Sequence, residues 1–269
     1  MIVFPLLAAA VLTTPHAASP TAHELIAGAE HAVHVNRLDQ AALMASRALA
    51  AGASGSEMDR LLADLAFANA KYPEALTRYE ALLKSDPLNP AFQEHAGIAA
   101  LKLGKVERAY GYLAAATSSS TATWRSWDAL GVAADMKAEW SKADDCYAKA
   151  AQLAPDEFEP LNNHGWSLVL RGKWSAALPF FERAVALQPK SGRARDNLDL
   201  AKAALEPQIP ERRAGESDES WAARLNDAGL AAAAVGDKAR ATAAFTQALE
   251  ISGTWYARAA NNLKALAKK

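Results

Sequence analysis

The sequence predicts an all-α protein built as a solenoid of stacked helical hairpins, and three observations support this prediction. Glycine accounts for 14 of 269 residues and aromatic residues for 7%, while alanine is abundant, a composition that favours closely packed helices over sheets. Small and aromatic residues recur at an interval of 34 residues. Proline and glycine stand where this interval requires the chain to turn.

Five columns of residues define the 34-residue interval. The clearest column is glycine, at Gly97, Gly131 and Gly165. The other four are an alanine column, an aromatic column, a second small-residue column and a proline column: Ala75, Ala109, Ala143, Ala177; Tyr79, Leu113, Tyr147, Phe181; Leu82, Ala116, Ala150, Ala184; and Pro87, Pro155, Pro189. Glycine and alanine let two antiparallel helices approach closely, aromatic rings fill the space between neighbouring hairpins, and proline stops the second helix.

These columns resemble the tetratricopeptide repeat, a helical hairpin with a series of Trp, Leu-Gly, Tyr, Ala, Phe, Ala and Pro. The match is strongest in one repeat, at Trp127, Leu130, Gly131, Ala143, Tyr147, Ala150 and Pro155. The resemblance implies a right-handed superhelix of hairpins. It also implies a concave groove, lined by the first helix of each hairpin, that binds a peptide or a helix of a partner protein.

The repeat also sets the expected domain organisation. We expect a solenoid over residues 19–205, made of an atypical first hairpin at 22–53, hairpins at 56–87, 90–121, 124–155 and 158–189, and a capping helix at 193–205. Residues 206–217 are rich in proline and charge, which predicts an extended linker. The pattern returns at Gly229 and Phe245, so residues 218–269 are expected to form a C-terminal hairpin resembling the repeat, followed by a capping helix.

The N-terminal segment resembles a secretory signal peptide. Its first 12 residues are largely apolar, and the small residues that follow fit cleavage after Ala17 or Ala18. We therefore expect residues 1–18 to be a signal peptide and the protein to be exported, with the periplasm as its compartment. A cytoplasmic location is the alternative, because no Lys or Arg precedes the apolar stretch. That stretch is too short to span a bilayer, and no transmembrane segment is expected.

Charge and motifs argue against several other classes of function. The chain has 29 basic and 30 acidic residues, so it lacks the positive field on which nucleic-acid binding relies. No phosphate-binding glycine loop or nucleophile motif occurs, and the single cysteine, Cys146, is expected to be a small packed residue. We expect no catalytic residue, cofactor or metal, and hence no enzyme. The alternative is a metal-dependent hydrolase using His31 and His34, although no carboxylate or cysteine cluster completes a ligand shell.

The resemblance places candidate binding residues in the groove: Arg125, Asp128, Asn162, Asn163, Trp166, Arg193 and Asn197. Asn163 and Asn197 occupy one repeat position, and their amides suit the backbone of an extended peptide, or else bonds within their own helices. Trp166 is either an anchor for a partner or a core residue packed on the next hairpin. Chaperone-binding relatives need Lys and Asn where this chain has Asp128 and Val132, so a chaperone terminus is not the expected ligand.

The predicted function is therefore a non-enzymatic scaffold that binds a protein or peptide partner in a bacterial envelope assembly. Exported proteins of this family resemble accessory factors of pilus or secretion assembly, notably those of tight-adherence pilus systems. Those factors are typically lipid-anchored, and this sequence departs from them in having no cysteine near its N-terminus. A structural spacer with no ligand in the groove is the remaining alternative.

Overall fold

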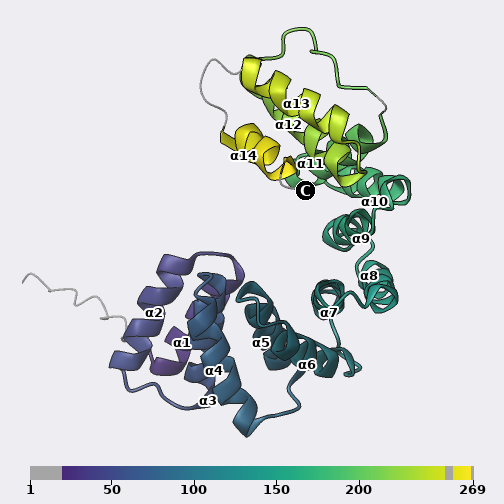
Figure 1. Ribbon diagram of the computed structural model, residues 1–269. Helices are drawn as coiled ribbons and strands as arrows, with labels where there is room; N and C mark the ends of the chain where they lie inside the picture. Colours follow the sequence, from purple (N-terminus) through teal and green to yellow (C-terminus); the bar gives the residue numbers. More distant parts are fainter. Residues whose placement is uncertain (1–19, 207, 252–256, 268–269) are drawn as a thin grey trace, which may run out of the picture. The chain divides into compact units, whose positions relative to one another are not determined.

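The computed structural model describes residues 20–206, 208–251 and 257–267, so the signal peptide predicted at residues 1–18 lies outside the described residues. Within this part every regular element is an α-helix, as Figure 1 shows, and the predicted all-α fold class is confirmed. The helices are α1 (Ala22–His34), α2 (Leu38–Ala50), α3 (Ser56–Ala68), α4 (Tyr72–Ser85), α5 (Pro90–Lys102), α6 (Val106–Thr117), α7 (Trp124–Met136), α8 (Trp140–Leu153), α9 (Glu159–Leu170), α10 (Trp174–Leu187), α11 (Gly192–Leu205), α12 (Asp218–Ala234), α13 (Lys238–Ile251) and α14 (Ala257–Leu266).

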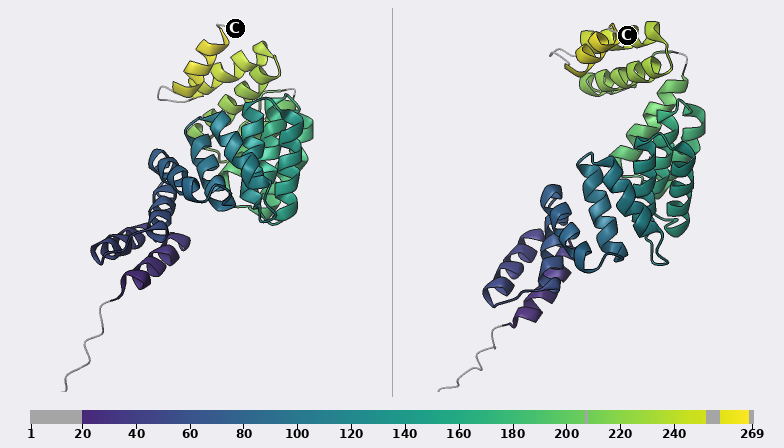
Figure 2. Two further views of the ribbon diagram at one scale, coloured as in Figure 1. Left: turned by 90° about the horizontal axis from the view of Figure 1, so that it is seen from below. Right: turned by 60° about the horizontal axis from the view of Figure 1, so that its bottom comes forward.

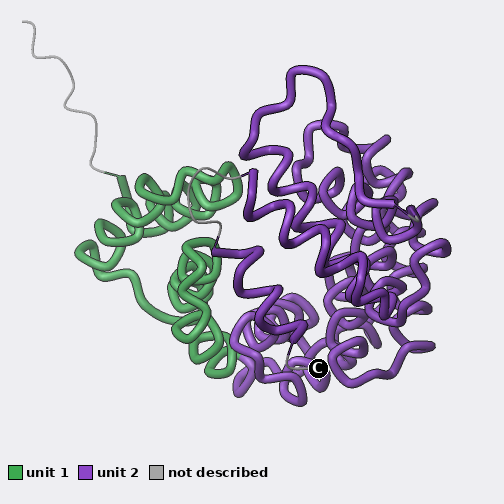
Figure 3. Tube along the Cα trace, turned by 45° about the horizontal axis from the view of Figure 1, so that its top comes forward, with its two compact units in different colours: residues 1–82 green, residues 83–269 purple. Residues whose placement is uncertain are grey.

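The chain divides into two compact units, residues 1–82 and residues 83–269, which Figure 3 shows in green and purple. The division falls inside α4, within the stretch that the sequence predicts as one solenoid. The predicted domain limits stay a prediction. We refer to the two parts as unit 1 and unit 2.

The turns inside the hairpins repeat more regularly than the sequence suggested. A left-handed residue ends the first helix of successive hairpins at the same interval, at Asn36, Ala70, Gly104, Ala138 and Gly172, with φ between 56° and 69°. In each case the next N–H bonds back across the turn, as when Lys105 donates to the carbonyl of Ala100 at 2.9 Å. The glycines at two of these positions favour this conformation by their residue type, whereas alanine gives no sign of it in the sequence.

Unit 1 is built around an apolar cluster shared by its first three helices. Leu25, Ile26 and Ala29 of α1 pack with Met58 and Leu61 of α3, and all five are buried. An ion pair between Arg60 and Glu30 also joins α3 to α1. The Tyr79 hydroxyl of α4 donates to Asp64 of α3 at 2.6 Å. Unit 1 therefore combines a buried apolar cluster with polar links between helices.

In unit 2 the glycine column faces the aromatic column inside each hairpin. A Cβ built on Gly131 of α7 would lie 2.7 Å from the Tyr147 ring of α8. The same construction gives 2.7 Å from Gly165 to Phe181 and 2.5 Å from Gly229 to Phe245. Atoms do not approach so closely, so a side chain at these positions would force the helices apart. Glycine thus allows a ring to approach the opposite helix closely.

The first helices of consecutive hairpins in unit 2 also pack on one another, from α5 to α7, α9 and α11. Both views of Figure 2 show the teal and green helices of residues 120–190 stacked side by side. The C-terminal hairpin continues this packing, because Ala231 of α12 joins a buried cluster with Phe181 of α10 and Leu198 of α11. None of the described helices is both long and apolar enough to cross a membrane.

The described part of the segment between α11 and α12, which we predicted as a linker, contains no helix. Arg224 of α12 bonds to both carboxylate oxygens of Glu216 in this segment, at 2.7 and 2.8 Å. These bonds lower the pKa of Glu216 to about 2. Ile209 packs on the apolar cluster of α12 and α13. The segment is therefore tied to the C-terminal hairpin by an ion pair and an apolar contact.

Candidate functional site

Unit 2 contains a cavity of about 330 Å³ lined by side chains from its stacked first helices. Four of the seven predicted binding residues line it: Arg125, Asp128, Asn163 and Arg193. They come from α7, α9 and α11, and α5 adds further residues to the wall. We call this space the groove cavity.

One wall of the groove cavity is apolar. Ile98 and Leu101 of α5 line the cavity together with Val132 and Met136 of α7. Met136 is 54% exposed, so part of its apolar side chain is open to a ligand. An apolar surface interrupted by a few polar groups is the usual character of a ligand site.

The two arginines of the cavity are each already in contact with an aromatic ring. The Arg125 guanidinium carbon lies 4.5 Å from the centroid of the Trp124 ring. Arg193 lies 5.3 Å from the ring centroid of Phe158 in the same way. Such cation–π contacts hold the charge beside the ring without neutralising it. The cationic groups of the cavity are therefore positioned by their neighbours.

The carboxyl groups of the cavity differ from its arginines in their hydrogen bonds and in their burial. Asp128 accepts two bonds from the Asn163 amide, at 3.1 and 2.9 Å, so this residue pair joins α7 to α9. Burial raises the pKa of Asp128 to about 7, and the charge of Glu159 adds to the effect, while Asn163 and Arg193 oppose it. The Oε2 atom of Glu159 is buried and has no hydrogen-bond partner among the described residues. The cavity thus holds more hydrogen-bond acceptor capacity than its own donors use.

The predicted asparagines bond to neighbouring first helices. Asn197 of α11 donates to the side-chain oxygen of Asn162 at 2.9 Å, and Asn162 is only 2% exposed. Asn163 makes the corresponding bond to Asp128 one hairpin earlier. Both bonds span 35 residues, one repeat plus one position. Asn163 faces the cavity, whereas Asn162 joins α9 to α11 from a buried position, and a role for either in binding stays a prediction.

Trp166 of α9 lies one repeat beyond Val132 and is 39% exposed. It is not among the residues that line the groove cavity. Its exposed ring area is available as contact surface beyond the cavity.

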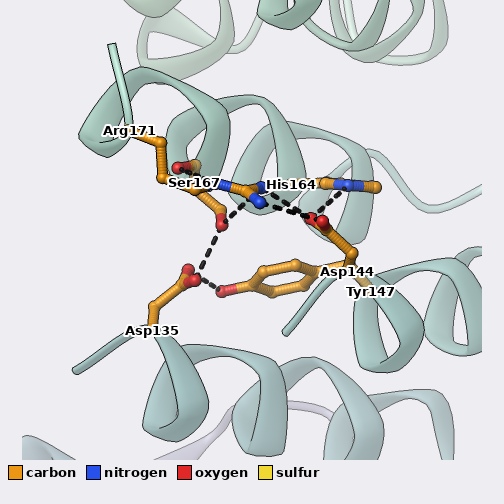
Figure 4. A network of polar contacts seen from close by, with 6 residues as sticks. All are labelled: Asp135, Asp144, Tyr147, His164, Ser167 and Arg171. Atoms are coloured by element: carbon orange, nitrogen blue, oxygen red, sulfur yellow. Dashed lines mark hydrogen bonds and ion pairs between the residues drawn. The ribbon is translucent and has the colours of Figure 1, made fainter. Parts of the chain in front are cut away.

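A second polar cluster, which the sequence did not reveal, joins α7, α8 and α9 (Figure 4). Arg171 donates to both carboxylate oxygens of Asp144, at 2.9 and 2.6 Å, and His164 Nε2 lies 3.0 Å from the same carboxylate. Because a carboxylate only accepts, the bonded tautomer of His164 carries its proton on Nε2. Burial lowers the pKa of His164, and the bonds from Arg171 lower that of Asp144.

On the other side of this cluster, Asp135 of α7 receives two hydroxyl bonds. Tyr147 donates to it at 2.8 Å and Ser167 at 2.7 Å, as the dashed lines in Figure 4 show. The His164 ring stacks on Tyr147 with centroids 5.6 Å apart, so the two halves of the cluster are in contact. We call these six residues the interhelix network.

The interhelix network contains the residue types of a hydrolase but not the required arrangement. Ser167 bonds to Asp135, whereas His164 bonds to a different carboxylate, that of Asp144. A nucleophile needs a base within hydrogen-bond reach, and within the described part of the chain no bond joins Ser167 to His164. The network therefore links three helices rather than forming a nucleophile–base pair. The sequence held no signal for it, because the spacing of its partners does not follow the repeat.

The other residues considered for chemistry are dispersed. His31 and His34 lie exposed in the last turn of α1, and among residues 20–206, 208–251 and 257–267 no group of three metal-binding side chains occurs. Cys146 is buried, which raises the pKa of its thiol to about 11. The thiol is therefore protonated at neutral pH, in keeping with the packed residue that the sequence predicts.

Stacked antiparallel hairpins, a glycine facing an aromatic ring in three of them, and a cavity lined by successive first helices define a helical-repeat binding protein. Comparison with known families makes this class specific. Residues 60–123 match the family model of the tetratricopeptide repeat. The predicted resemblance is confirmed, and these residues carry tetratricopeptide repeats.

Solved structures show the same fold. The structure of PilF from Pseudomonas aeruginosa is 15% identical and covers 92% of this chain and 97% of its own, with a TM-score of 0.54. MamA from Desulfovibrio magneticus RS-1 is 19% identical and covers 64% of this chain and 97% of its own, with a TM-score of 0.53. A chain of the APC/C hetero-tetramer Cut9-Hcn1 is 13% identical, covering 91% of this chain and 42% of its own, with a TM-score of 0.56. No curated protein matches the sequence.

Identities this low establish a shared fold alone. The tetratricopeptide fold binds protein or peptide partners, and proteins built from it are in general non-enzymatic scaffolds. In this general sense the chain is a protein–protein interaction scaffold.

Proposed function

We propose that this protein binds an extended peptide or a helix of a partner protein in the groove cavity of unit 2. The observation that carries the proposal is the origin of the cavity wall, which comes from four successive first helices, α5, α7, α9 and α11. A segment lying across these helices would contact several repeats at once. Such a wall suits an elongated ligand better than a compact one.

The chemistry of the wall supports the same proposal. Ile98, Val132 and Met136 offer apolar contact, while Arg125 and Asn163 offer donors for a backbone or side chain. A peptide needs both kinds of surface, because its main-chain polar groups must stay hydrogen-bonded when water is displaced. Met136 adapts readily to different partner side chains, since its chain is unbranched and polarisable.

As a second part of the proposal, the scaffold acts in an exported assembly of a bacterial envelope, with the periplasm as its compartment. Support comes from the apolar segment and small residues of positions 1–18, and from the resemblance to factors of tight-adherence pilus systems. The fold shared with Pseudomonas aeruginosa PilF is in keeping with a role in pilus or secretion assembly. Cell fractionation of the full chain with a C-terminal tag tests the compartment. Recovery in the cytoplasm would overturn this part and leave the binding proposal standing.

The binding proposal is tested by placing a charge in the apolar wall. Val132→Glu introduces a carboxylate that a buried apolar contact cannot tolerate, so we expect capture of the partner to be lost. Leu153→Glu is the matched control, because Leu153 is 46% exposed at the end of α8 and does not line the cavity. Both variants should keep the helical circular dichroism of the wild type.

The measurement is affinity capture from envelope extracts with quantitative mass spectrometry. Proteins retained by the wild type and by Leu153→Glu, but lost from Val132→Glu, are the expected result. If all three forms retain the same proteins equally, the groove cavity is not the binding site. If none retains any protein, the chain is a spacer instead.

A further inference from the structure

One carboxyl group of the groove cavity, that of Glu159, is not fully hydrogen-bonded within the described residues. Glu159 stands at the first position of α9, and its Oε2 atom is buried with no hydrogen-bond partner within the described residues. A buried carboxylate oxygen without a donor is unfavourable, and native proteins rarely keep one unless a ligand or water supplies it. Asp128, across the cavity, receives its hydrogen bonds from one neutral amide, that of Asn163.

The cations of the cavity leave Glu159 Oε2 without a bond, although the charge of Arg193 opposes the rise in the pKa of Asp128. Arg125 lies over Trp124 and Arg193 over Phe158. Lys102 is exposed at the end of α5. The structure thus has two arginines held on ring faces, one exposed lysine, and a buried carboxylate oxygen of Glu159 that none of them bonds. This separation leaves room for a cation that comes from outside.

The apolar wall indicates the shape of that cation. Ile98, Val132 and Met136 face the same space as Asp128 and Glu159. Long basic side chains bury an aliphatic stem along apolar surface and keep their charged end in polar surroundings. The volume of about 330 Å³ is at the lower end of the range of ligand pockets, which suits one long side chain rather than a whole cofactor.

We propose that the groove cavity receives an arginine or lysine side chain of the bound segment, with its charged end between Glu159 and Asp128 and its stem along Ile98 and Val132. This inference rests on the proposed function, since it names the side chain that the bound peptide presents. The bound segment would then present a basic side chain to the cavity, not an acidic one. Burial raises the pKa of Asp128, and a further cation beside this carboxyl group would oppose that rise.

The test uses four pools of fluorescent octapeptides, degenerate except for one central residue that is arginine, citrulline, norleucine or glutamate. Citrulline matches arginine in shape and lacks its charge. Fluorescence anisotropy at pH 8 measures the affinity of each pool for the wild type. We expect the arginine pool to bind about tenfold more tightly than the citrulline pool, the effect of one or two charge-assisted hydrogen bonds.

Two variants locate the preference. Glu159→Gln keeps the side-chain shape, and we expect it to reduce the advantage of arginine over citrulline to about twofold or less. Glu182→Gln is the matched control, since Glu182 is exposed on α10 and does not line the cavity. It should keep the full advantage of arginine. Thermal melting of both variants establishes that they fold.

The outcomes separate the inference from the proposed function. If all four pools bind equally to the wild type and Val132→Glu abolishes that binding, the groove binds peptides but the basic side chain is wrong. If arginine keeps its advantage in Glu159→Gln, the preference arises elsewhere and the inference fails. If no pool binds, both the inference and the peptide-binding proposal are overturned.

Discussion

Two parts of unit 2, α7–α9 and α12–α14, are built on one plan and differ in what surrounds the aromatic ring. In each, a glycine of the first helix faces a ring of the second, Gly131 with Tyr147 and Gly229 with Phe245. In each, an asparagine of the following first helix bonds back to the preceding one. Asn163 donates to Asp128 and Asn262 to Asn226, the latter at 2.9 Å.

The difference lies in polarity. Tyr147 carries a hydroxyl that donates to Asp135, and its ring stacks on His164, so the ring belongs to the interhelix network. Phe245 has no hydroxyl and lies in an apolar cluster with Leu225 and Ala259. A hairpin of this kind therefore requires only the contact between a glycine of its first helix and a ring of its second. The polar bonds are an addition to this contact, found in the part of unit 2 that contains the groove cavity.

The largest test of this comparison removes the ring itself. Tyr147→Ala should lower the free energy of unfolding by about 3–5 kcal/mol, because it leaves a cavity against Gly131. Phe245→Ala should lower it by a similar amount if the contact is the shared element. Chemical denaturation of both variants measures this. An unchanged midpoint for either would mean that its ring does not hold the hairpin together.

A smaller effect is expected from crowding the same contact. Gly131→Ala places a Cβ 2.7 Å from the Tyr147 ring and should destabilise by about 1–3 kcal/mol through overpacking. Gly111→Ala is the control, because Gly111 is an exposed residue of α6 with no atom within 4 Å of a built Cβ. There alanine should stabilise by up to about 1 kcal/mol through helix propensity. Changes of the same sign at both positions would contradict the contact.

Removing only the hydroxyl makes the first region resemble the second. Tyr147→Phe should destabilise by about 1 kcal/mol, since Asp135 loses one of its two hydroxyl donors and keeps Ser167. The fold should remain, as Phe245 shows that a ring without a hydroxyl suffices. Denaturation midpoints check the size. A loss of stability as large as that of Tyr147→Ala would show that the interhelix network, not the ring, stabilises the hairpin.

The turns of the two regions provide another comparison. The turn after α7 has alanine in the left-handed conformation, with φ of 57° at Ala138, whereas the turn after α12 has Gly236 with φ of 86°. Ala138→Gly should stabilise the protein by about 0.5–1 kcal/mol, because relief of the strained φ outweighs the greater freedom of glycine when unfolded. Thermal melting would detect it. Destabilisation would show that alanine is not strained there.

A last test depends on pH and concerns the carboxyl acceptor that distinguishes Asp128 from Asn226. The pKa of Asp128 is about 7 in the folded protein against 3.8 ordinarily, so the folded state keeps a proton that the unfolded state releases between these values. The stability of the wild type should therefore fall relative to that of Asp128→Asn as pH rises from about 4 to about 7. Denaturation at several pH values gives the difference. If the stability of both proteins changed with pH in the same way, burial would not raise the pKa of Asp128.

Much of the fold was predictable from the residues because its contacts are local. A hairpin requires helices that begin and end at suitable residues and small residues where two helices touch, and these recur at 34-residue spacing. The left-handed turns at Ala70 and Ala138 could not be predicted from the sequence, because alanine adopts this conformation only when the packing on either side imposes it.

The candidate site was predictable only in outline. The repeat position placed Arg125, Asp128, Asn163 and Arg193 on the first helices, and the structure brings these four together around one cavity. It could not indicate that Asn162 is buried between α9 and α11, or that Arg171 would pair with Asp144 from 27 residues away. Those contacts depend on how adjacent hairpins are rotated against one another.

By itself, the sequence determined the helical class, the interval of the hairpins and the contact of a small residue with a large one inside them, because these follow from side-chain size and spacing along one helix pair. Only the tertiary structure decided which polar groups satisfy one another and which, such as the buried oxygen of Glu159, remain without a partner among the described residues. The physical reason is that a hydrogen bond between separate hairpins forms or fails with a change of about a few tenths of an ångström in the distance between its atoms. Residue spacing does not specify distances to that precision, and it does not specify desolvation either.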